Sequence, residues 1–253
     1  MIRTLANPFV IFPSSLAVQW LAAYLGDVLR RRGRALGEEE REDFDVVRTA
    51  TLTLLALVIG FSFSMAVSRY DQRKNYEEAE ANAIGTEYVR ADLLPAEDAA
   101  KIRELLRRYT DRRISFYLAR DQHEIEQIDA ATAKLQTELW SAVSHAATSQ
   151  PTPVVALAVS GMNDVLNSQG YTQAAWWNRI PIEAWGLLGL IAISCNLLLG
   201  YGERRTSVFT LLVLPLVVSI SFFLIADIDS PRGGVIHILP QNLIAQSKAM
   251  PAQ

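Results

Sequence analysis

The chain has 253 residues, half of them are apolar, and its formal net charge at pH 7 is −3. This slight acidic balance, without a basic domain, argues against a nucleic-acid-binding protein. The single cysteine, Cys195, excludes a disulfide framework and any paired-cysteine metal site. No segment alternates apolar and polar residues over a useful length, so we expect an all-α protein.

Four windows of about 20 residues contain no Asp, Glu, Lys or Arg, and this length crosses a ~30 Å hydrocarbon core at 1.5 Å rise per residue. These windows are Thr4–Gly26, Thr49–Ser68, Ala184–Gly202 and Thr206–Ala226. They predict a polytopic membrane protein with four transmembrane helices, over about 5–26, 48–68, 182–202 and 206–227. The first window lacks the small-residue cleavage pattern of a secretory signal, so we interpret it as a helix of the mature protein.

The spans form two helical hairpins around a water-soluble insert. The expected segments are a first hairpin, a helical domain, a second hairpin and a C-terminal tail, over 1–68, 69–179, 180–228 and 229–253. Asp27–Val47 joins the first two spans. Only Tyr201–Arg205 joins the last two, and so short a connection requires antiparallel neighbours.

The second span carries polar residues that a simple anchor does not need. Thr53, Leu57, Phe61, Ser64 and Ser68 recur at spacings of three and four and therefore share one helix face. As a pore lining, this face has a polar entrance, a hydrophobic constriction and a hydroxyl-lined exit, and such constrictions can gate by dewetting. The alternative is that the face packs against the other spans, with its hydroxyls bonded back to helix carbonyls.

Charged residues follow this span at once and continue in a helical pattern. The residues that we expect to form structural ion pairs are Arg69, Asp71, Arg73, Glu80, Asn82 and Arg90. Burial of such groups is costly unless they are paired. We expect Glu80 and Asn82 to reach the arginines of this group across neighbouring helices.

The insert is predicted to be helical nearly throughout. Pro95 separates one helix from the next, which begins with Glu97 and Asp98 at the positive end of its dipole. One apolar stripe follows, made of Ile102, Leu105, Leu106, Tyr109, Phe116 and Tyr117. Asp121 with Glu124 resembles a capping box. Thr152 and Pro153 then begin a last helix towards Trp176, with Gly170 as the candidate break.

A heptad seam runs through the middle of the insert. Its members are Ile125, Ile128, Thr132, Leu135, Leu139, Ala142 and Ala146. The seam packs either inside the insert's own helical bundle or against a helix of another subunit.

Two acids, Asp227 and Asp229, end the fourth span. They either cap the end of the helix together with Pro231 or bind a cation in a turn. The three histidines are scattered, and neither a nucleophile–base pair nor a phosphate-binding loop is present. We therefore expect no metal site, no cofactor and no enzymatic activity.

Three segments, in order, resemble the bacterial bestrophin-like membrane family: GFSFSMAVSRYDQRKN, EEAEANAIGTEYVRADLLP and DIDSPRGG. The resemblance extends from Gly26 to about Ile238. A more distant similarity to bestrophin channels rests on Gly60-Phe61, on Arg69-Tyr70-Asp71 and on the entry to the third span around Pro181. It implies a pentamer of four-span subunits around one axial pore, with a narrow hydrophobic neck on the second span.

The chain departs from the channel pattern in three places. Only Tyr70 stands where channel bestrophins have paired aromatics, and Arg232 replaces the Phe of the segment after the fourth span. The acidic run that forms the calcium clasp of animal bestrophins is missing, which argues against calcium gating.

The orientation signals conflict. The positive-inside rule, applied to Arg30–Arg41 and to Arg204-Arg205, places the insert outside the cell. The resemblance implies the reverse, and we follow it: a multi-pass protein of the bacterial inner membrane with its insert and termini in the cytoplasm.

Two functions from different classes remain. The first is an oligomeric ion channel, a homo-oligomer in the lipid bilayer that passes small anions or monovalent cations. The second is a non-conducting scaffold or sensor that recruits a partner through its helical insert.

Overall fold

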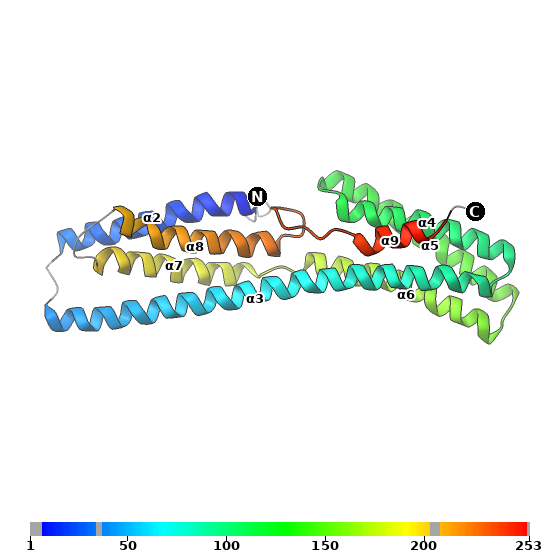
Figure 1. Ribbon diagram of the computed structural model, residues 1–253, viewed down its shortest axis with the longest axis horizontal. Helices are drawn as coiled ribbons and strands as arrows, with labels where there is room; N and C mark the ends of the chain where they lie inside the picture. The colour runs from blue at the N-terminus through cyan, green and yellow to red at the C-terminus, as the bar shows by residue number, and fades with distance from the viewer. Residues whose placement is uncertain (1–6, 34–36, 203–207, 252–253) are drawn as a thin grey trace. The chain divides into compact units, whose positions relative to one another are not determined.

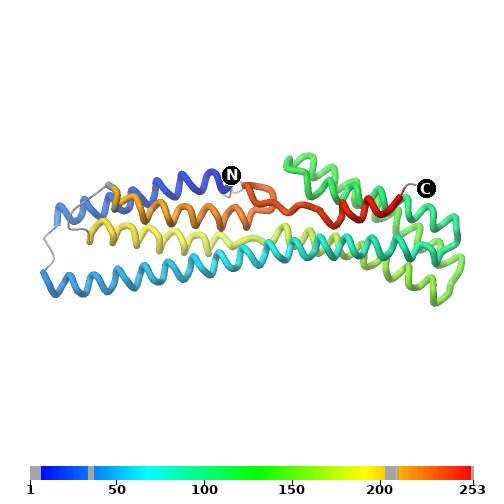
Figure 2. The backbone as a smooth tube through the Cα atoms, in the orientation of Figure 1, coloured from blue at the N-terminus to red at the C-terminus, as the bar shows by residue number. Residues whose placement is uncertain are grey.

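The computed structural model describes residues 7–33, 37–202 and 208–251 (Figures 1 and 2). These residues form helices and no strand, which confirms the all-α prediction for the described part of the chain. The α-helices are α2 Pro8–Arg32, α3 Glu38–Arg90, α4 Ala96–Leu118, α5 Gln122–Ser149, α6 Pro153–Trp177, α7 Ile182–Gly202, α8 Val208–Asp229 and α9 Gln241–Ala249. A short 3-10 helix, η1 Ala91–Leu93, follows α3.

The chain divides into two compact units. The first contains residues 1–70 and 179–237, and the second contains residues 71–178 and 238–253. Helix α3 contributes to both, because the division falls within it. The C-terminal tail, which we expected to be one segment, is also divided: its first residues belong to the first unit and α9 belongs to the second.

Four helices of the described chain are long and apolar enough to cross a membrane, as predicted. In the first unit, α2 packs against both α7 and α8, which also contact each other (Figure 1). The core of this unit contains Leu55, Leu188, Ala192, Cys195, Val218 and Phe222. This unit is therefore a membrane bundle in which the first span fills the space between the third and the fourth.

Two glycines allow α2 and α7 to approach closely. A Cβ atom on Gly200 would lie 1.9 Å from the Ala23 carbonyl oxygen, and one on Gly26 would lie 2.1 Å from that of Leu197. Without a hydrophobic driving force between helices in lipid, small residues stabilise association by letting the backbones come together. Gly26 and Gly200 therefore determine this helix contact.

The first two spans extend further than the uncharged windows indicated. Helix α2 continues to Arg32 and α3 begins at Glu38, so most of the predicted connection Asp27–Val47 is helical. The predicted starts of the first span, at residue 5, and of the fourth, at 206, lie outside the described residues. Basic residues in the last turn of α2 and acidic residues in the first turn of α3 stabilise both ends through the helix dipoles.

The second unit is a helical bundle with the predicted core. All six members of the apolar stripe on α4 are buried. Asp121 caps α5 by accepting hydrogen bonds from the backbone N–H groups of His123 and Glu124. Thr152 caps α6 through the N–H of Val155. The expected break at Gly170 is wrong: α6 continues through it to Trp177, since one glycine costs an exposed helix only about 1 kcal/mol.

The heptad seam lies inside this bundle. Each of its seven residues is buried, and α5 packs against α4 and α6 of the same chain. The bundle interior is complete without a helix from another subunit.

Candidate functional site

The predicted pore face of α3 is exposed along its whole length. We use this name for Thr53, Leu57, Phe61, Ser64 and Ser68. Its two apolar members, Leu57 and Phe61, are 52% and 64% exposed. Apolar residues that belonged to the core of this unit would be buried. The three hydroxyl-bearing residues are exposed as well.

Helix α3 packs on the other spans through its opposite face. Leu55, Ser62 and Ala66 are buried, and Leu55 and Ala66 belong to apolar clusters with side chains of α7 and α8. At 100° per residue, this buried face lies about 160° around the helix from the pore face. The pore face is therefore not used in packing within the single chain.

The hydroxyl groups along the pore face differ in their hydrogen bonding. The Thr53 hydroxyl donates to the Thr49 carbonyl oxygen over 2.9 Å, as expected for a threonine in an apolar helix. Ser64 and Ser68 make no side-chain hydrogen bond within the described part of the chain. Their hydroxyls are thus available to water or to a passing ion.

The acids at the end of α8 bind backbone amides. Both oxygens of Asp229 accept from the Ile180 N–H, at 3.1 and 3.2 Å, and one of them lies 3.4 Å from the Arg69 guanidinium. Asp227 accepts from the N–H groups of Val235 and Ile236 at 2.7 and 2.9 Å. Among the described residues no cluster of three or more His, Cys, Asp or Glu could hold a metal ion. Both carboxylates thus bind backbone N–H groups outside α8, so neither acts as a cap of its own helix.

Three polar side chains meet inside the membrane bundle, which the sequence analysis did not predict. The Gln19 amide donates to the Ser219 hydroxyl over 3.2 Å, and the Asn196 amide donates to the Gln19 carbonyl oxygen over 3.0 Å. All three residues are buried, and they belong to α2, α8 and α7. Hydrogen bonds of this kind link neighbouring helices in lipid.

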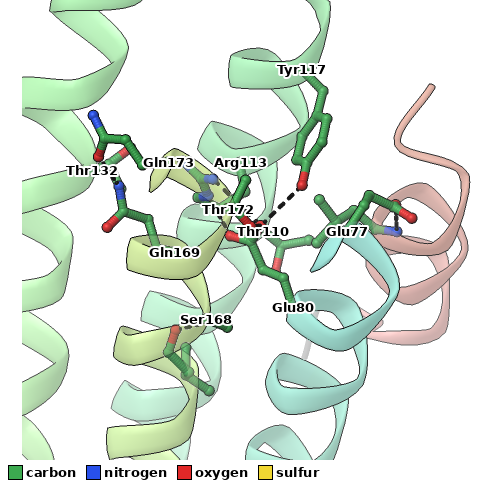
Figure 3. A network of polar contacts seen from close by, with 12 residues as sticks. Glu77, Glu80, Thr110, Arg113, Tyr117, Thr132, Ser168, Gln169, Thr172 and Gln173 are labelled. Carbon is green, nitrogen blue, oxygen red and sulfur yellow. Dashed lines mark hydrogen bonds and ion pairs between the residues drawn. The ribbon is translucent and has the colours of Figure 1, made fainter. Parts of the chain in front are cut away.

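A buried polar network lies at the centre of the second unit (Figure 3). The Glu80 carboxylate of α3 is paired with the Arg113 guanidinium of α4, and both side chains are fully buried. The Thr172 hydroxyl of α6 donates to the same carboxylate over 3.1 Å, and the Tyr117 hydroxyl lies 3.4 Å from it. This polar network joins three helices around one charge.

The electrostatics of the polar network follow from its burial. Burial alone would lower the pKa of Arg113, but the Glu80 carboxylate beside it holds that pKa above its usual value. Burial raises the pKa of Tyr109, and the Glu80 charge raises it further. The network is therefore a buried ion pair with neutral tyrosine hydroxyl groups around it.

Two further charged residues of α3 hold other elements of the second unit. Arg73 donates to the carbonyl oxygens of Ala175 and Asn178, at 3.1 and 3.0 Å, where α6 ends. Glu77 accepts from the Leu243 N–H over 2.9 Å and from the Asn242 amide over 2.6 Å. It thereby satisfies donors at the start of α9, which have no partner inside their own helix.

The expected ion pairs form with partners other than those predicted. Glu80 pairs with Arg113 rather than with Arg69, Arg73 or Arg90. Arg69 reaches Asp229, and Arg90 donates to the Leu157 carbonyl oxygen over 3.4 Å. Asp71 and Asn82 are exposed.

Arg113 carried a signal that the sequence analysis missed. It stands four residues after Tyr109 and four before Tyr117, within the apolar stripe of α4. A charged residue at such a position must be buried with a partner. The search for that partner would have led to an acid on a neighbouring helix.

The family of the chain is given by comparison with known proteins. The Bestrophin-like domain matches residues 17–243. The chain belongs to the bestrophin-like family. No curated protein sequence matches it. This family and the four helices that could cross a membrane together indicate a membrane protein.

Solved structures of bacterial bestrophin homologues share the fold. A variant of the homologue from Klebsiella pneumoniae has a TM-score of 0.67 and 13% identity, over 92% of this chain and 98% of that one. Another crystal structure of the Klebsiella pneumoniae homologue has a TM-score of 0.64 and 16% identity, over 93% of this chain and 94% of that one. At such low identity the similarity shows the bestrophin fold and nothing finer.

Proposed function

We propose that this bestrophin-like protein is a subunit of an oligomeric ion channel, with an axial pore lined by the second span. One observation carries the proposal: the pore face of α3 is exposed while the opposite face holds the helix to α7 and α8. A helix that only anchored the bundle would have no use for an exposed row of hydroxyls in lipid, where polar groups without partners are costly.

The order of residues along this face suits conduction. Leu57 and Phe61 would form a narrow apolar neck, and Ser64 and Ser68 would line its exit with hydroxyls. Hydroxyls without formal charge suit small anions or monovalent cations, and a dewetting neck can close the pore without a moving gate. The bestrophin resemblance supports five subunits around the axis.

The scaffold alternative has less support. In that alternative a partner binds the helical insert, and the heptad seam, one candidate surface for a partner helix, is buried between helices of the same chain. We also propose that the protein has no enzymatic activity, a proposal that the channel type of the bestrophin-like family supports.

A flux experiment on reconstituted protein tests the pore. Shrinking the neck with Leu57→Ala/Phe61→Ala should widen and wet it, so liposomes should leak ions faster than those with the parent protein. The matched control is Phe63→Ala, because this phenylalanine is also exposed but lies about 160° around the helix from Phe61. Equal flux for all three, in oligomers of the same size, would refute the pore assignment.

Particle images provide a separate test of the assembly. Five-fold symmetry with an axial hole would support the proposal. A monomer or dimer whose α3 pore face contacts only lipid or detergent would contradict it and favour the scaffold.

The orientation that we propose, with the second unit in the cytoplasm of a bacterium, is tested by thiol labelling. In a Cys195→Ser background, a cysteine at the exposed Gln150 should react with an impermeant reagent only after cell lysis. A cysteine at the exposed Glu39, beyond the other end of the second span, should react in intact cells. The reverse pattern would restore the positive-inside reading.

A further inference from the structure

Glu87 differs from the other buried acids of the second unit. Its side chain is fully buried on α3, yet neither carboxylate oxygen has a hydrogen-bond partner within the described chain. Glu77 and Glu80, on the same helix, each accept at least two hydrogen bonds. Since burial of an unpaired carboxylate is very costly in free energy, this site disfavours the charged form of Glu87.

The space around the carboxyl group is filled by α6. A Cβ atom on Gly161 would lie 2.1 Å from a Glu87 carboxylate oxygen and 2.5 Å from the Arg90 guanidinium nitrogen. The carboxyl therefore rests against the bare backbone of α6, which only glycine allows. A metal ion with its coordination shell does not fit in such a contact, whereas a proton does.

The charges near Glu87 do not neutralise it. Arg90 crowds the same point beside Gly161 but donates to the Leu157 carbonyl oxygen, and no ion pair joins it to Glu87 in the described structure. Asp164 on α6 adds a like charge. Arg103 on α4 is paired with Asp92 and is not free to compensate.

The balance of these effects favours a neutral carboxyl. Burial raises the pKa of Glu87 to about 8, Arg90 opposes this rise, and Asp164 adds to it. Glu87 lies 19 residues beyond Ser68, where the uncharged window of α3 ends, so it is outside the membrane-spanning segment.

We propose that the Glu87 carboxyl is a proton-binding site at the contact of α3 with α6, occupied at neutral pH, and that loss of the proton loosens this contact. The chemistry is a simple ionisation: the carboxyl releases H⁺ to water and leaves a carboxylate packed against the Gly161 backbone. A rise in pH above neutral therefore weakens the contact between α3 and α6 in the second unit.

The sign of the pH dependence follows from linkage. The folded chain holds a proton that the unfolded chain releases, because the carboxyl pKa rises from 4.5 to about 8 on folding. The free energy of unfolding therefore falls as pH rises between these two values and levels off above the higher one.

Infrared spectroscopy of the full-length protein tests the proposal directly. Spectra at about pH 6 and about pH 10 fall on either side of the expected transition. The parent should show the carbonyl band of a protonated carboxylic acid at the lower pH, and this band should disappear with a midpoint near 8. Glu87→Gln should lack the band, and its melting temperature should fall less with pH than that of the parent.

Controls separate this site from other acids. Glu78→Gln makes the same change at an exposed acid of α3 and should keep both the band and the pH dependence. Glu87→Leu serves as a second variant if the amide disturbs folding. A parent without the band at the lower pH, or a Glu87 variant that retains it, would overturn the proposal.

Discussion

The Glu80 carboxylate on α3 and the Arg113 guanidinium on α4 form an ion pair that is fully buried from solvent. Tyr117 and Thr172 complete the shell around the carboxylate, so the pair joins three helices of the second unit. Such a pair contributes little net stability compared with apolar residues of the same shape, but it becomes costly as soon as one partner is lost. We expect the pair to favour one register of α3 against α4, since other registers would leave both charges buried without a partner.

Removing one partner should unfold the second unit more readily. Arg113→Met should lower the free energy of unfolding by about 3–5 kcal/mol, because it leaves Glu80 charged and unpaired. The double variant Glu80→Gln/Arg113→Met should cost less than Arg113→Met alone. Chemical denaturation of the parent, Glu80→Gln, Arg113→Met and the double variant measures both effects, and a double variant as unstable as the sum of its single changes would contradict the pairing.

The heptad seam should behave as core and not as an interface. Leu139→Asp places a carboxylate at a fully buried position of α5, where it loses hydration and gains no partner. We expect unfolding of α4–α6, seen as rapid hydrogen exchange in these helices. The exposed Thr137→Asp is the control and should be tolerated. A Leu139→Asp protein that only dissociates, with its bundle intact, would mean that the seam joins subunits.

Glu77 should be required to keep α9 in place. Glu77→Ala removes the acceptor of the Leu243 N–H and the Asn242 amide. The Leu243 N–H is buried, and a buried donor left without a partner costs about 1–3 kcal/mol. Proteolysis within 241–249 should therefore become faster while the rest of the second unit stays protected. The neighbouring exposed acid gives the control Glu78→Ala, which should be cleaved at the parent's rate.

The sequence predicted what depends on periodicity along one helix. The four spans, the apolar stripe of α4, the seam of α5 and the caps at Asp121 and Thr152 all follow from local spacing and residue type. Two of the errors were also local. Uncharged windows underestimated α2 and α3, since charged residues at helix ends extend a helix beyond the membrane, and Gly170 was given too much weight as a breaker.

The pairing between helices could not be predicted in the same way. That Glu80 meets Arg113 depends on how α3 and α4 rotate against each other, which one-dimensional spacing does not encode. The contact of Gln19, Asn196 and Ser219 has the same origin, because each is an isolated polar residue in a different span. Gly161 likewise has no local signature, since its role depends on the Glu87 carboxyl of another helix.

The same substitution at two glycines of α6 should change the stability of the protein in opposite directions. Gly161→Ala pushes a methyl group into the Glu87 carboxyl and the Arg90 guanidinium, and Glu87 is buried with no room to withdraw. Overpacking of this kind typically costs about 1–3 kcal/mol. At Gly170 nothing lies within 4 Å of the added Cβ, so Gly170→Ala should stabilise the protein by about 0.5–1 kcal/mol through helix propensity. Melting curves of the two variants and the parent measure both effects. A Gly161→Ala protein as stable as Gly170→Ala would show that α3 and α6 are not in close contact at Glu87.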